Sequence, residues 1–370
     1  MSGEQLSYSQ QLTLKTEHLR QQLQVFQPNP STLIPLEVFA SEPKGYRMRA
    51  EFRVWHEGDE LYYIMFHQGT REKYRVDTFP PGSALINTLM PAVLDYVRDR
   101  PLLRNRLFQV DFLTTTTGQA TISLLYHRQL SDEWQRQALA MREAFQRFGS
   151  VEIIGRARKQ KVLVNTDRVV ETLNIENRSY HFEQIENSFT QPNALVNTKM
   201  IEWALNCTNA EKNQEVDLLE LYCGNGNFSL PLAQNFRRVL ATEISRTSVQ
   251  SAQTNIQLNQ IDNVVIARMS AEEFSSAMDG SFTSKRVEAL QLSSYQFDSV
   301  LVDPPRAGLD TDTLDMVAQY EHILYISCNP DTLCENLQKL TQTHALERIA
   351  LFDQFPFTQH TEAGVYLKKK

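Results

Sequence analysis

The first half of the chain combines helical and alternating hydrophobic patterns. In "RMRAEFRVW" (47–55), Met48, Ala50, Phe52 and Val54 alternate with charged or polar residues, as in a strand with one buried face. Apolar residues at helical spacing predict helices over 5–23, 83–98 and 134–148, and short runs predict further strands at 61–66, 107–116, 120–126, 151–154 and 161–164. This pattern is typical of a mixed α+β domain with a substantial antiparallel sheet.

The second half has a different rhythm, in which short apolar runs alternate with helical segments. Predicted strands cover 216–221, 239–242, 264–267, 299–302 and 323–326, after a predicted helix over 194–207. Such alternation predicts an α/β fold with βαβ units and a parallel sheet covered by helices on both faces. The polar segment 279–296 lacks a period, and we expect a surface loop there.

The change of rhythm divides the chain. Its 370 residues exceed what a single hydrophobic core usually serves, so two domains are expected. We place the boundary near 175–190, with an α+β domain over 1–180 and an α/β domain over 181–370.

Composition favours a globular cytoplasmic protein. Apolar residues make up 41% and charged residues 22%, and no apolar run approaches the roughly 20 residues of a membrane helix. The opening segment 1–20 is polar and unlike a signal peptide. The cysteines Cys207, Cys223, Cys328 and Cys334 lack the spacing of a disulfide framework or a metal site. We therefore expect no membrane, no bound metal and a reducing compartment.

Charge is distributed unevenly along the chain. Residues 1–180 carry 23 Lys and Arg against 20 Asp and Glu, a net charge of +3, whereas residues 181–370 carry 14 against 24, a net charge of −10. The basic side chains thus gather in the first half of an acidic protein, which hints at an anionic partner for that half.

Polar residues follow several predicted strands of the second half. "VDLLELYCGNGNFSL" (216–230) is a strand, a turn with Gly224 and Gly226, and a helix start, without the third glycine of a dinucleotide fingerprint. Glu243 ends the next strand, where an acidic residue accepts hydrogen bonds from ribose hydroxyls in doubly wound sheets. A tight βα turn without a ligand is the alternative for the glycines alone.

Asp303 makes the ligand-binding interpretation stronger. It ends the fourth predicted strand in "SVLVDPPRAGL" (299–309), and ligands of open α/β sheets bind outside such carboxyl ends. This combination resembles the class I S-adenosylmethionine-dependent methyltransferases, with a Rossmann-like fold. The residues that resemble the cofactor-binding set are Gln191, Tyr222, Asn227, Glu243 and Asp303.

Cys328 occupies an unusual position in "YISCNPDTL" (325–333). It follows a buried strand, and Asn329 and Pro330 are a favourable N-cap and first residue of a helix. Unpaired N–H groups at a helix N-terminus stabilise an anion, so we expect a lowered thiol pKa and a nucleophilic Cys328. A small buried hydrophobe that closes a strand is the alternative.

A methyltransferase needs such a thiol when it methylates carbon 5 of a pyrimidine. Addition of a thiolate to carbon 6 makes carbon 5 nucleophilic, and a general base must later remove the proton on carbon 5. "FPFTQHTEAGVYL" (355–367) supplies Glu362 just before a final apolar strand, although a solvated Glu is the simpler interpretation of that segment alone.

Three motifs together point to one family. "DPPRAGL", "SCNPDT" and "HTEAGV", in this order, resemble the RNA 5-methyluridine methyltransferase family, and the likeness extends over essentially the whole chain, including "LFQVDFLTT". The resemblance implies that Cys328 is the nucleophile, that Glu362 accepts the proton and that S-adenosylmethionine is the methyl donor.

The resemblance is closest to the tRNA branch of that family. Relatives that act on ribosomal RNA usually bind an iron–sulfur cluster in their first half, whereas the first cysteine here is Cys207. The implied substrate is the T-arm uridine of tRNA, with T-loop-like structures such as tmRNA as further substrates and no obligate protein partner. The alternatives are the same chemistry on ribosomal RNA and a non-catalytic RNA-binding module.

The first half then becomes the RNA-binding domain. The target base must leave its stack to react, so this domain should hold an opened loop. The candidates for phosphate contacts are Arg47, Arg49, Arg53, Arg156, Arg158, Lys159 and Lys161, and those for base stacking are Phe108, Phe112 and Tyr126. A solvated sheet face and core aromatics are the alternatives for these residues.

Overall fold

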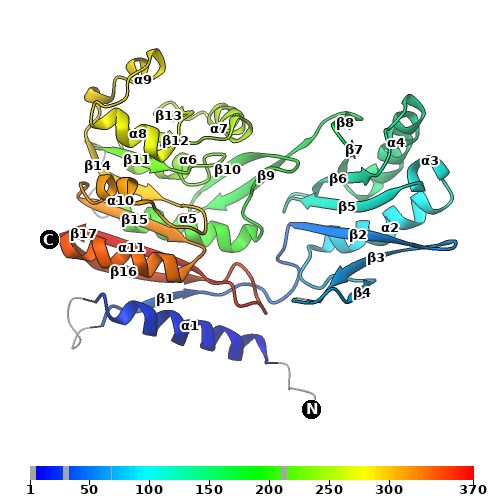
Figure 1. Ribbon diagram of the computed structural model, residues 1–370, viewed down its shortest axis with the longest axis horizontal. Helices are drawn as coiled ribbons and strands as arrows, with labels where there is room; N and C mark the ends of the chain where they lie inside the picture. Colours follow the sequence, from blue (N-terminus) through cyan, green and yellow to red (C-terminus); the bar gives the residue numbers. More distant parts are fainter. Residues whose placement is uncertain (1–5, 28–32, 68, 210–214) are drawn as a thin grey trace. The chain divides into compact units, whose positions relative to one another are not determined.

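A computed structural model describes residues 6–27, 33–67, 69–209 and 215–370, which fall into two compact units (Figure 1). Unit 2 comprises Glu42–Thr172 and Glu183–Ala194, and unit 1 comprises the described residues up to Ser41, Leu173–Phe182 and Leu195–Lys370. The expected single boundary near residue 180 was therefore too simple. The N-terminal segment belongs to the unit of the C-terminal half because its helix packs there.

Unit 1 is built on an eight-stranded sheet of order β1-β16-β17-β15-β14-β11-β12-β13. The strands are β1 (Leu36–Phe39), β11 (Asp217–Leu221), β12 (Arg238–Thr242), β13 (Val264–Ala267), β14 (Phe297–Val302), β15 (His322–Ser327), β16 (His344–Phe352) and β17 (Glu362–Lys369). All the strands that the alternation predicted are present. Strand order reverses between β11 and β14, which is where ligands bind in sheets of this type.

The sheet is mixed, whereas the sequence pattern predicted a parallel one. β17 runs antiparallel to both of its neighbours, β15 and β16. An antiparallel partner needs only a short connection, and the chain returns from β16 to β17 through residues 353–361. The first residue of β17 therefore lies at the edge where the parallel strands end.

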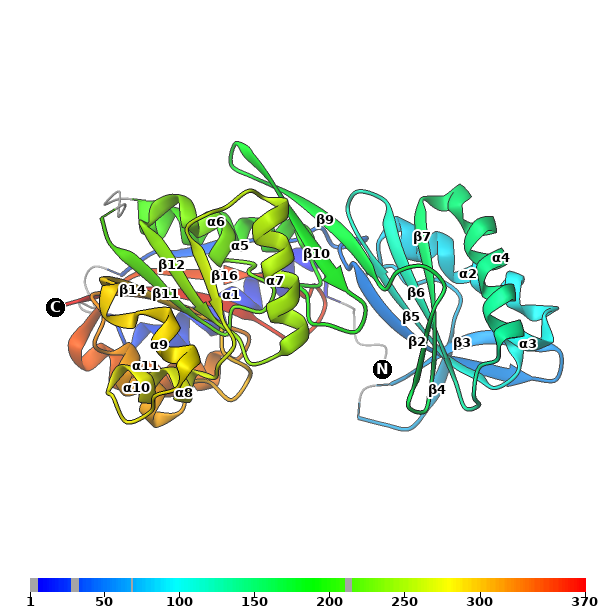
Figure 2. The ribbon, with the colours of Figure 1, turned by 90° about the horizontal axis from the view of Figure 1, so that it is seen from above.

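Helices cover both faces of this sheet (Figure 2). On one face lie α5 (Ala194–Asn209), α6 (Ser229–Leu232) and α7 (Arg246–Leu258), and on the other α8 (Ala271–Met278), α10 (Thr311–Val317) and α11 (Pro330–Thr343). The buried Leu19 and Leu23 of α1 (Tyr8–Gln24) join the core of the second face. The start of the helix predicted over 5–23 lies outside the described residues, and Ser7 caps α1.

The segment 279–296 is more ordered than expected. It contains α9 (Lys285–Leu290), capped by Ser284, and a 3-10 turn at Leu292–Ser294. Val287 is buried against the unit 1 core, so one apolar contact stabilises a helix too short to show a period in the sequence.

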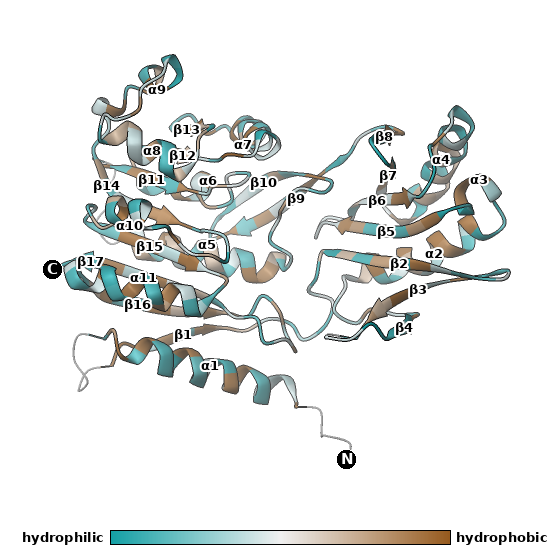
Figure 3. Cartoon of the chain, in the orientation of Figure 1, coloured by the Kyte–Doolittle hydropathy of each residue, from teal (hydrophilic) through white to brown (hydrophobic). Residues whose placement is uncertain are grey.

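Unit 2 is a seven-stranded sheet of order β4-β3-β2-β5-β6-β7-β8. Its elements are β2 (Arg49–Glu57), β3 (Glu60–Phe66), β4 (Lys73–Val76), α2 (Ala84–Arg98), α3 (Pro101–Arg104), β5 (Leu107–Thr114), β6 (Gln119–Tyr126), α4 (Asp132–Phe145), a 3-10 turn (Gln146–Phe148), β7 (Ser150–Ala157) and β8 (Gln160–Leu163). α2 and α4 pack on the apolar sheet face, and α2 is the more apolar in Figure 3. β9 (Arg168–Ile175) and β10 (Arg178–Ile185) form a separate two-stranded sheet.

Two predicted features of unit 2 were wrong. Phe112 and Tyr126 are buried in the core rather than available to stack on bases, and the Tyr126 hydroxyl donates to the carbonyl of Leu103 at 2.7 Å. The strands predicted at 151–154 and 161–164 imply a basic loop over 155–161 between them, but β7 and β8 extend through most of that segment and leave only Arg158 and Lys159 in the turn.

Candidate active site

Three of the predicted cofactor residues directly follow parallel strands of the unit 1 sheet, at the same edge. Leu221 at the end of β11 pairs with Thr242 of β12 and with Val302 of β14. The next residues of the three strands are Tyr222, Glu243 and Asp303, so parallel register alone brings their backbones side by side. The site begins at the reversal of strand order.

The turn after β11 has a backbone suited to a ligand. Gly224 and Gly226 have φ of 56° and 85°, and Tyr222 shares this left-handed region with φ of 62°. A Cβ on Gly224 would meet no atom within 4 Å, so the turn is open at that point. The Gly224 and Ser245 N–H groups donate to the Glu243 carboxylate at 3.0 and 2.7 Å.

The side chain of Asn227 faces α5. Its amide exchanges two hydrogen bonds with Asn197, at 2.8 and 2.9 Å. Behind the turn, the Ser229 hydroxyl donates to Glu220, whose pKa burial raises to about 8. These bonds fix the turn from the interior of the unit.

The Asp303 carboxyl group is partly desolvated and has no cationic partner among the described residues. Burial raises its pKa to about 7, and among the described residues none donates a hydrogen bond to its side chain. A positively charged ligand would favour the ionised form.

Cys328 sits between β15 and α11 as the sequence predicted. The Asn329 side chain accepts from the Asp331 N–H at 3.2 Å, which caps α11, and Pro330 is its first residue. Leu333, Leu337 and Leu340 form the buried face of that helix. Asn329 also donates through its amide to the Arg306 carbonyl at 3.0 Å, which ties the loop after Asp303 to the start of α11.

Glu362 lies across from Cys328. Ser327 pairs with Ala363 in the antiparallel ladder of β15 and β17, so one residue further Cys328 and Glu362 face each other. Cys328 is half-buried, and Glu362 is only 5% exposed. Two groups far apart in the sequence thus meet at the edge that carries Asp303.

The pKa of Cys328 differs from the prediction. Burial raises the pKa of the thiol and the charges of Glu362 and Asp303 raise it further, whereas Arg306 and a backbone hydrogen bond lower it. Burial and Asp303 likewise raise the pKa of Glu362 well above its usual value. The expected effect of the helix N-terminus is outweighed, because a thiolate here would lie beside two carboxyl groups.

Arg306 and His360 are two residues that the motif analysis did not single out. The Arg306 guanidinium lies 3.1 Å from the His360 Nδ1, and both side chains are exposed. Arg306 provides the positive charge that acts on both Cys328 and Glu362. Its place in "DPPRAGL", three residues after Asp303, was the available signal.

Gln191 belongs to unit 2, whereas the other predicted cofactor residues belong to unit 1. Its assignment to the cofactor site stays a prediction.

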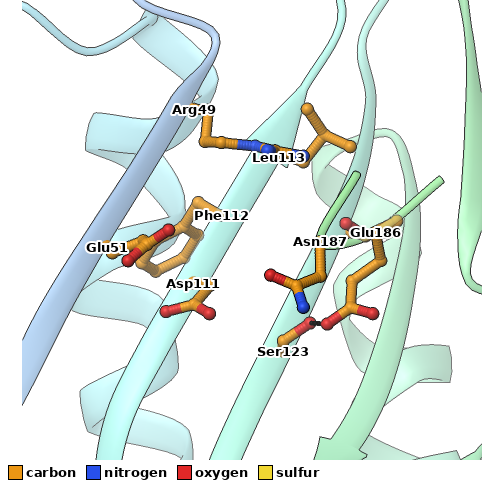
Figure 4. Close-up of a pocket in the computed structure, with 9 residues that line it drawn as sticks. Arg49, Glu51, Asp111, Phe112, Leu113, Ser123, Glu186 and Asn187 are labelled. Atoms are coloured by element: carbon orange, nitrogen blue, oxygen red, sulfur yellow. Dashed lines mark hydrogen bonds between the residues drawn. The ribbon is translucent and has the colours of Figure 1, made fainter. Parts of the chain in front are cut away.

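A polar pocket lies on the sheet face of unit 2 opposite α2 and α4 (Figure 4). Arg49 and Glu51 of β2 and Asp111 of β5 line it, together with Ser123 of β6, which donates to Glu186 at 2.7 Å. Burial and the neighbouring Glu51 and Glu186 raise the pKa of Asp111 to about 6. Arg49 therefore lies among carboxyl groups rather than on an open basic surface.

The remaining RNA-binding candidates differ in availability. Arg156 and Lys161 form ion pairs with Glu186, the first with contacts of 2.5 and 2.6 Å. Arg158, Lys159 and Arg53 are exposed, and the Arg47 Nε donates to the Arg49 carbonyl at 2.8 Å.

Phe108 is part of an accessible aromatic group. Its ring stacks on exposed His127 at 3.8 Å, and the Arg53 guanidinium lies 5.4 Å from the Phe108 ring centre. His127 was missed because a single histidine after a strand carries no pattern.

Every helix among the described residues is too short or too polar to span a membrane. Within the same part of the chain, no group of three or more His, Cys, Asp or Glu is arranged to hold a metal ion.

Sheet order, the antiparallel β17 and the glycine turn after β11 define an α/β methyltransferase fold in unit 1. A solved Pyrococcus abyssi structure, titled as a tRNA (uracil-54, C5)-methyltransferase in complex with S-adenosyl-L-homocysteine, shares the fold. Its TM-score is 0.69 at 18% identity, over 98% of this chain and 84% of that one.

Residues 7–370 match the tRNA (uracil-5-)-methyltransferase family, and the chain belongs to it. A Pseudoalteromonas atlantica relative is 53% identical over 98% of this chain and 97% of its own length, and one from Vibrio cholerae is 59% identical over 90% and 91%. Both are named tRNA/tmRNA (uracil-C(5))-methyltransferase.

Proposed function

We propose that this protein methylates carbon 5 of the T-loop uridine in tRNA, with S-adenosylmethionine as donor and Cys328 as a covalent nucleophile. The observation that carries the proposal is the meeting of Cys328 and Glu362 across β15 and β17, at the sheet edge that carries Asp303. Family membership and the names of the relatives support the same substrate and product. T-loop-like structures in tmRNA are further substrates of the proposed activity.

Cys328 and Glu362 serve different parts of the proposed reaction. The Cys328 thiolate adds to carbon 6 of the uracil, and the electron pair of the 5,6 double bond moves toward the carbonyl at carbon 4 to form an enolate. Carbon 5 then takes the methyl group from the donor, whose sulfur leaves as the neutral thioether of S-adenosylhomocysteine. Glu362 accepts the proton left on carbon 5, the double bond forms again, and the bond between carbon 6 and sulfur breaks. The raised pKa of Glu362 suits a group that must hold this proton.

The donor fits the charge of the site. S-adenosylmethionine supplies an electrophilic methyl group on a positively charged sulfur. Asp303 is a half-buried carboxyl group to which no described residue donates a hydrogen bond, and the turn at Gly224 is open. We assign ribose contacts to Glu243 and further contacts to Tyr222, Asn227 and Gln191. A cation near Asp303 and Cys328 also favours the thiolate, which offsets the raised thiol pKa of the free protein.

We assign RNA binding to unit 2. The stacked Phe108 and His127 with Arg53 above them form a platform for an unstacked base, and exposed Arg158 and Lys159 suit phosphates. Arg47 and Arg49 are less available candidates. Arg156 and Lys161 act in the fold of unit 2 through Glu186 rather than on RNA.

The test is transfer of labelled methyl groups to unmodified tRNA and to ribosomal RNA fragments in parallel, followed by mass-spectrometric mapping of 5-methyluridine. The expected product is 5-methyluridine in the T loop of tRNA, absent with Cys328→Ala. Methylation confined to ribosomal fragments would overturn the substrate. An unchanged cellular phenotype on replacing the protein by Cys328→Ala would favour a non-catalytic RNA-binding role.

A further inference from the structure

Lys15 is a buried cation on the apolar face of α1. Its side chain is 6% exposed, and it occupies the stripe that also holds the buried Leu19 and Leu23. The Nζ atom donates to Asp353 Oδ1 at 2.7 Å, to the Phe355 carbonyl at 3.0 Å and to the His360 carbonyl at 2.7 Å. All three donor positions of the ammonium group are thereby used.

These three partners lie on one segment, residues 353–361, which we call the return loop. It begins after Phe352, the last residue of β16, and ends just before Glu362, the first residue of β17. Phe352 and Glu362 pair in the ladder, so the return loop is closed at its base. Lys15 thus binds the first residue of the return loop, Asp353, and the carbonyls of Phe355 and His360, the latter two residues before Glu362.

Other residues of α1 hold the same loop. The Phe357 N–H donates to the Gln11 side-chain oxygen at 2.9 Å, and the Gln11 amide donates to the Thr358 carbonyl at 2.5 Å. The Tyr8 ring lies 5.8 Å from the ring of Phe357. One face of α1 thus contacts the return loop from Asp353 to His360.

A buried lysine is a costly way to attach a helix. Burial lowers the pKa of Lys15 despite Asp353, and an apolar residue at this position would continue the stripe. Lys15 also fixes the course of the return loop, because its ammonium group donates to one carboxylate and two backbone carbonyls of a segment without secondary structure. The segment so fixed leads to one side chain of the proposed mechanism.

We propose that Lys15 is a positioning residue for Glu362, and that α1 holds the return loop so that this carboxyl group faces the adduct on Cys328. The inference rests on the proposed function. It adds a role for the N-terminal helix in one step of the reaction, the removal of the proton from carbon 5 and the release of Cys328.

The two parts of the reaction make this role measurable. Thiol addition and methyl transfer do not use Glu362 as a base, whereas release of the product does. A misplaced Glu362 therefore leaves the enzyme bound to methylated RNA. A loss of stability alone would instead reduce all steps together.

The experiment is a single turnover of the full-length protein with labelled S-adenosylmethionine and unmodified tRNA, with the covalent adduct followed on denaturing gels. For Lys15→Met we expect release to slow by about tenfold or more, with adduct formation within about threefold of wild type. Calorimetry should give an unchanged affinity for S-adenosylmethionine. Asp353→Asn keeps an oxygen acceptor and both carbonyl contacts, and we expect little change in either rate.

Leu23→Ala is the matched control, because it weakens the packing of the same helix two turns away from the return loop. This variant should lower the melting temperature without changing the ratio of the rate of product release to the rate of adduct formation. If Lys15→Met does not fold, Lys15→Met with Asp353→Leu removes both buried charges but leaves the carbonyls unheld. The same slow release is expected from that double variant.

Equal slowing of formation and release in Lys15→Met, or the same ratio change in Leu23→Ala, would overturn the positioning role. Glu362→Gln separates this failure from failure of the proposed function. If Glu362→Gln accumulates adduct and Lys15→Met does not, only the positioning role is wrong. If Glu362→Gln releases product normally, the assigned base is wrong and the positioning role falls with it.

Discussion

Cys328 and Glu362 face each other at the ends of two antiparallel strands, one residue beyond the pair formed by Ser327 and Ala363. Burial raises the pKa of both groups, the charge of Glu362 raises the pKa of the Cys328 thiol further, and Asp303 raises the pKa of both. The free protein therefore keeps both groups protonated over a wider pH range than in water. A cationic donor and the nearby Arg306 shift the balance toward the thiolate.

Covalent catalysis predicts that the reaction can be stopped with the adduct intact. Fluorine on carbon 5 cannot leave as a proton does, so tRNA with 5-fluorouridine should trap an adduct on Cys328 that survives denaturing electrophoresis. Cys328→Ala should form none and should lose methyl transfer by more than about 10³-fold, as expected on removal of a nucleophile. Active enzyme without any trapped adduct would contradict this mechanism.

Glu362→Gln should separate methyl transfer from product release. The amide fills the same buried space but cannot accept the proton, so release should slow by about 10² to 10⁴-fold while the adduct forms. The measurement is the time course of the labelled adduct in a single turnover. Normal multiple turnover would show that another group removes the proton.

Arg306→Gln should make Cys328 less reactive. The guanidinium lowers the pKa of the thiol, so its removal raises that pKa and leaves less thiolate at any pH below it. Alkylation of Cys328 by iodoacetamide, followed by mass spectrometry of its peptide, should slow by about two- to tenfold at pH 7.5, and the pH profile should move to higher pH. A shift to lower pH would contradict the assigned sign.

The raised pKa of Asp303 should make the binding of S-adenosylmethionine depend on pH. Its pKa is about 7 in the free protein, and a cationic donor binds the ionised form, so affinity should rise with pH up to about 7 and level off above it. Asp303→Asn should abolish this dependence and weaken binding by about 10- to 100-fold, the value of roughly 1.5–3 kcal/mol for a charged hydrogen bond. Calorimetry at pH 6, 7 and 8 measures both effects, and a pH-dependent Asn variant would exclude Asp303 as the cause.

Two arginines on unit 2 should behave differently. Arg53→Ala should weaken tRNA binding and reduce the slope of log affinity against log salt by about 1, because it removes an exposed cation beside Phe108. Arg156→Ala should leave the slope nearly unchanged and cost about 1–3 kcal/mol of folding stability, because Glu186 loses its partner. Filter binding at several salt concentrations, with thermal melts, distinguishes the two. The reverse pattern would place Arg156 on the RNA.

The central strands β11 to β15 of unit 1 were predictable because each is a short apolar run with its own turn, whereas β1 and β16, which carry charged residues, were not predicted. The helix at α11 was predictable from the cap and proline alone. Lys15 and the closing of α1 on the return loop were not. A lysine in an apolar stripe is a visible anomaly, but its partner Asp353 lies at the other end of the chain. The short α9 and the pocket around Asp111 depended on contacts that no local pattern records.

By itself, the sequence determined which residue types end each strand: the glycine turn, Glu243, Asp303 and Cys328 all follow apolar runs, because parallel strands with covering helices require that pattern. Only the tertiary structure decided how those ends are assembled. The antiparallel β17 sets Glu362 against Cys328, and the N-terminal helix joins the unit of the C-terminal half, because strand register and buried ion pairs are long-range contacts. The tertiary structure also decided the pKa of Cys328. Burial and the charges of Glu362 and Asp303 raise it, and both effects depend on which groups are close in space rather than along the chain.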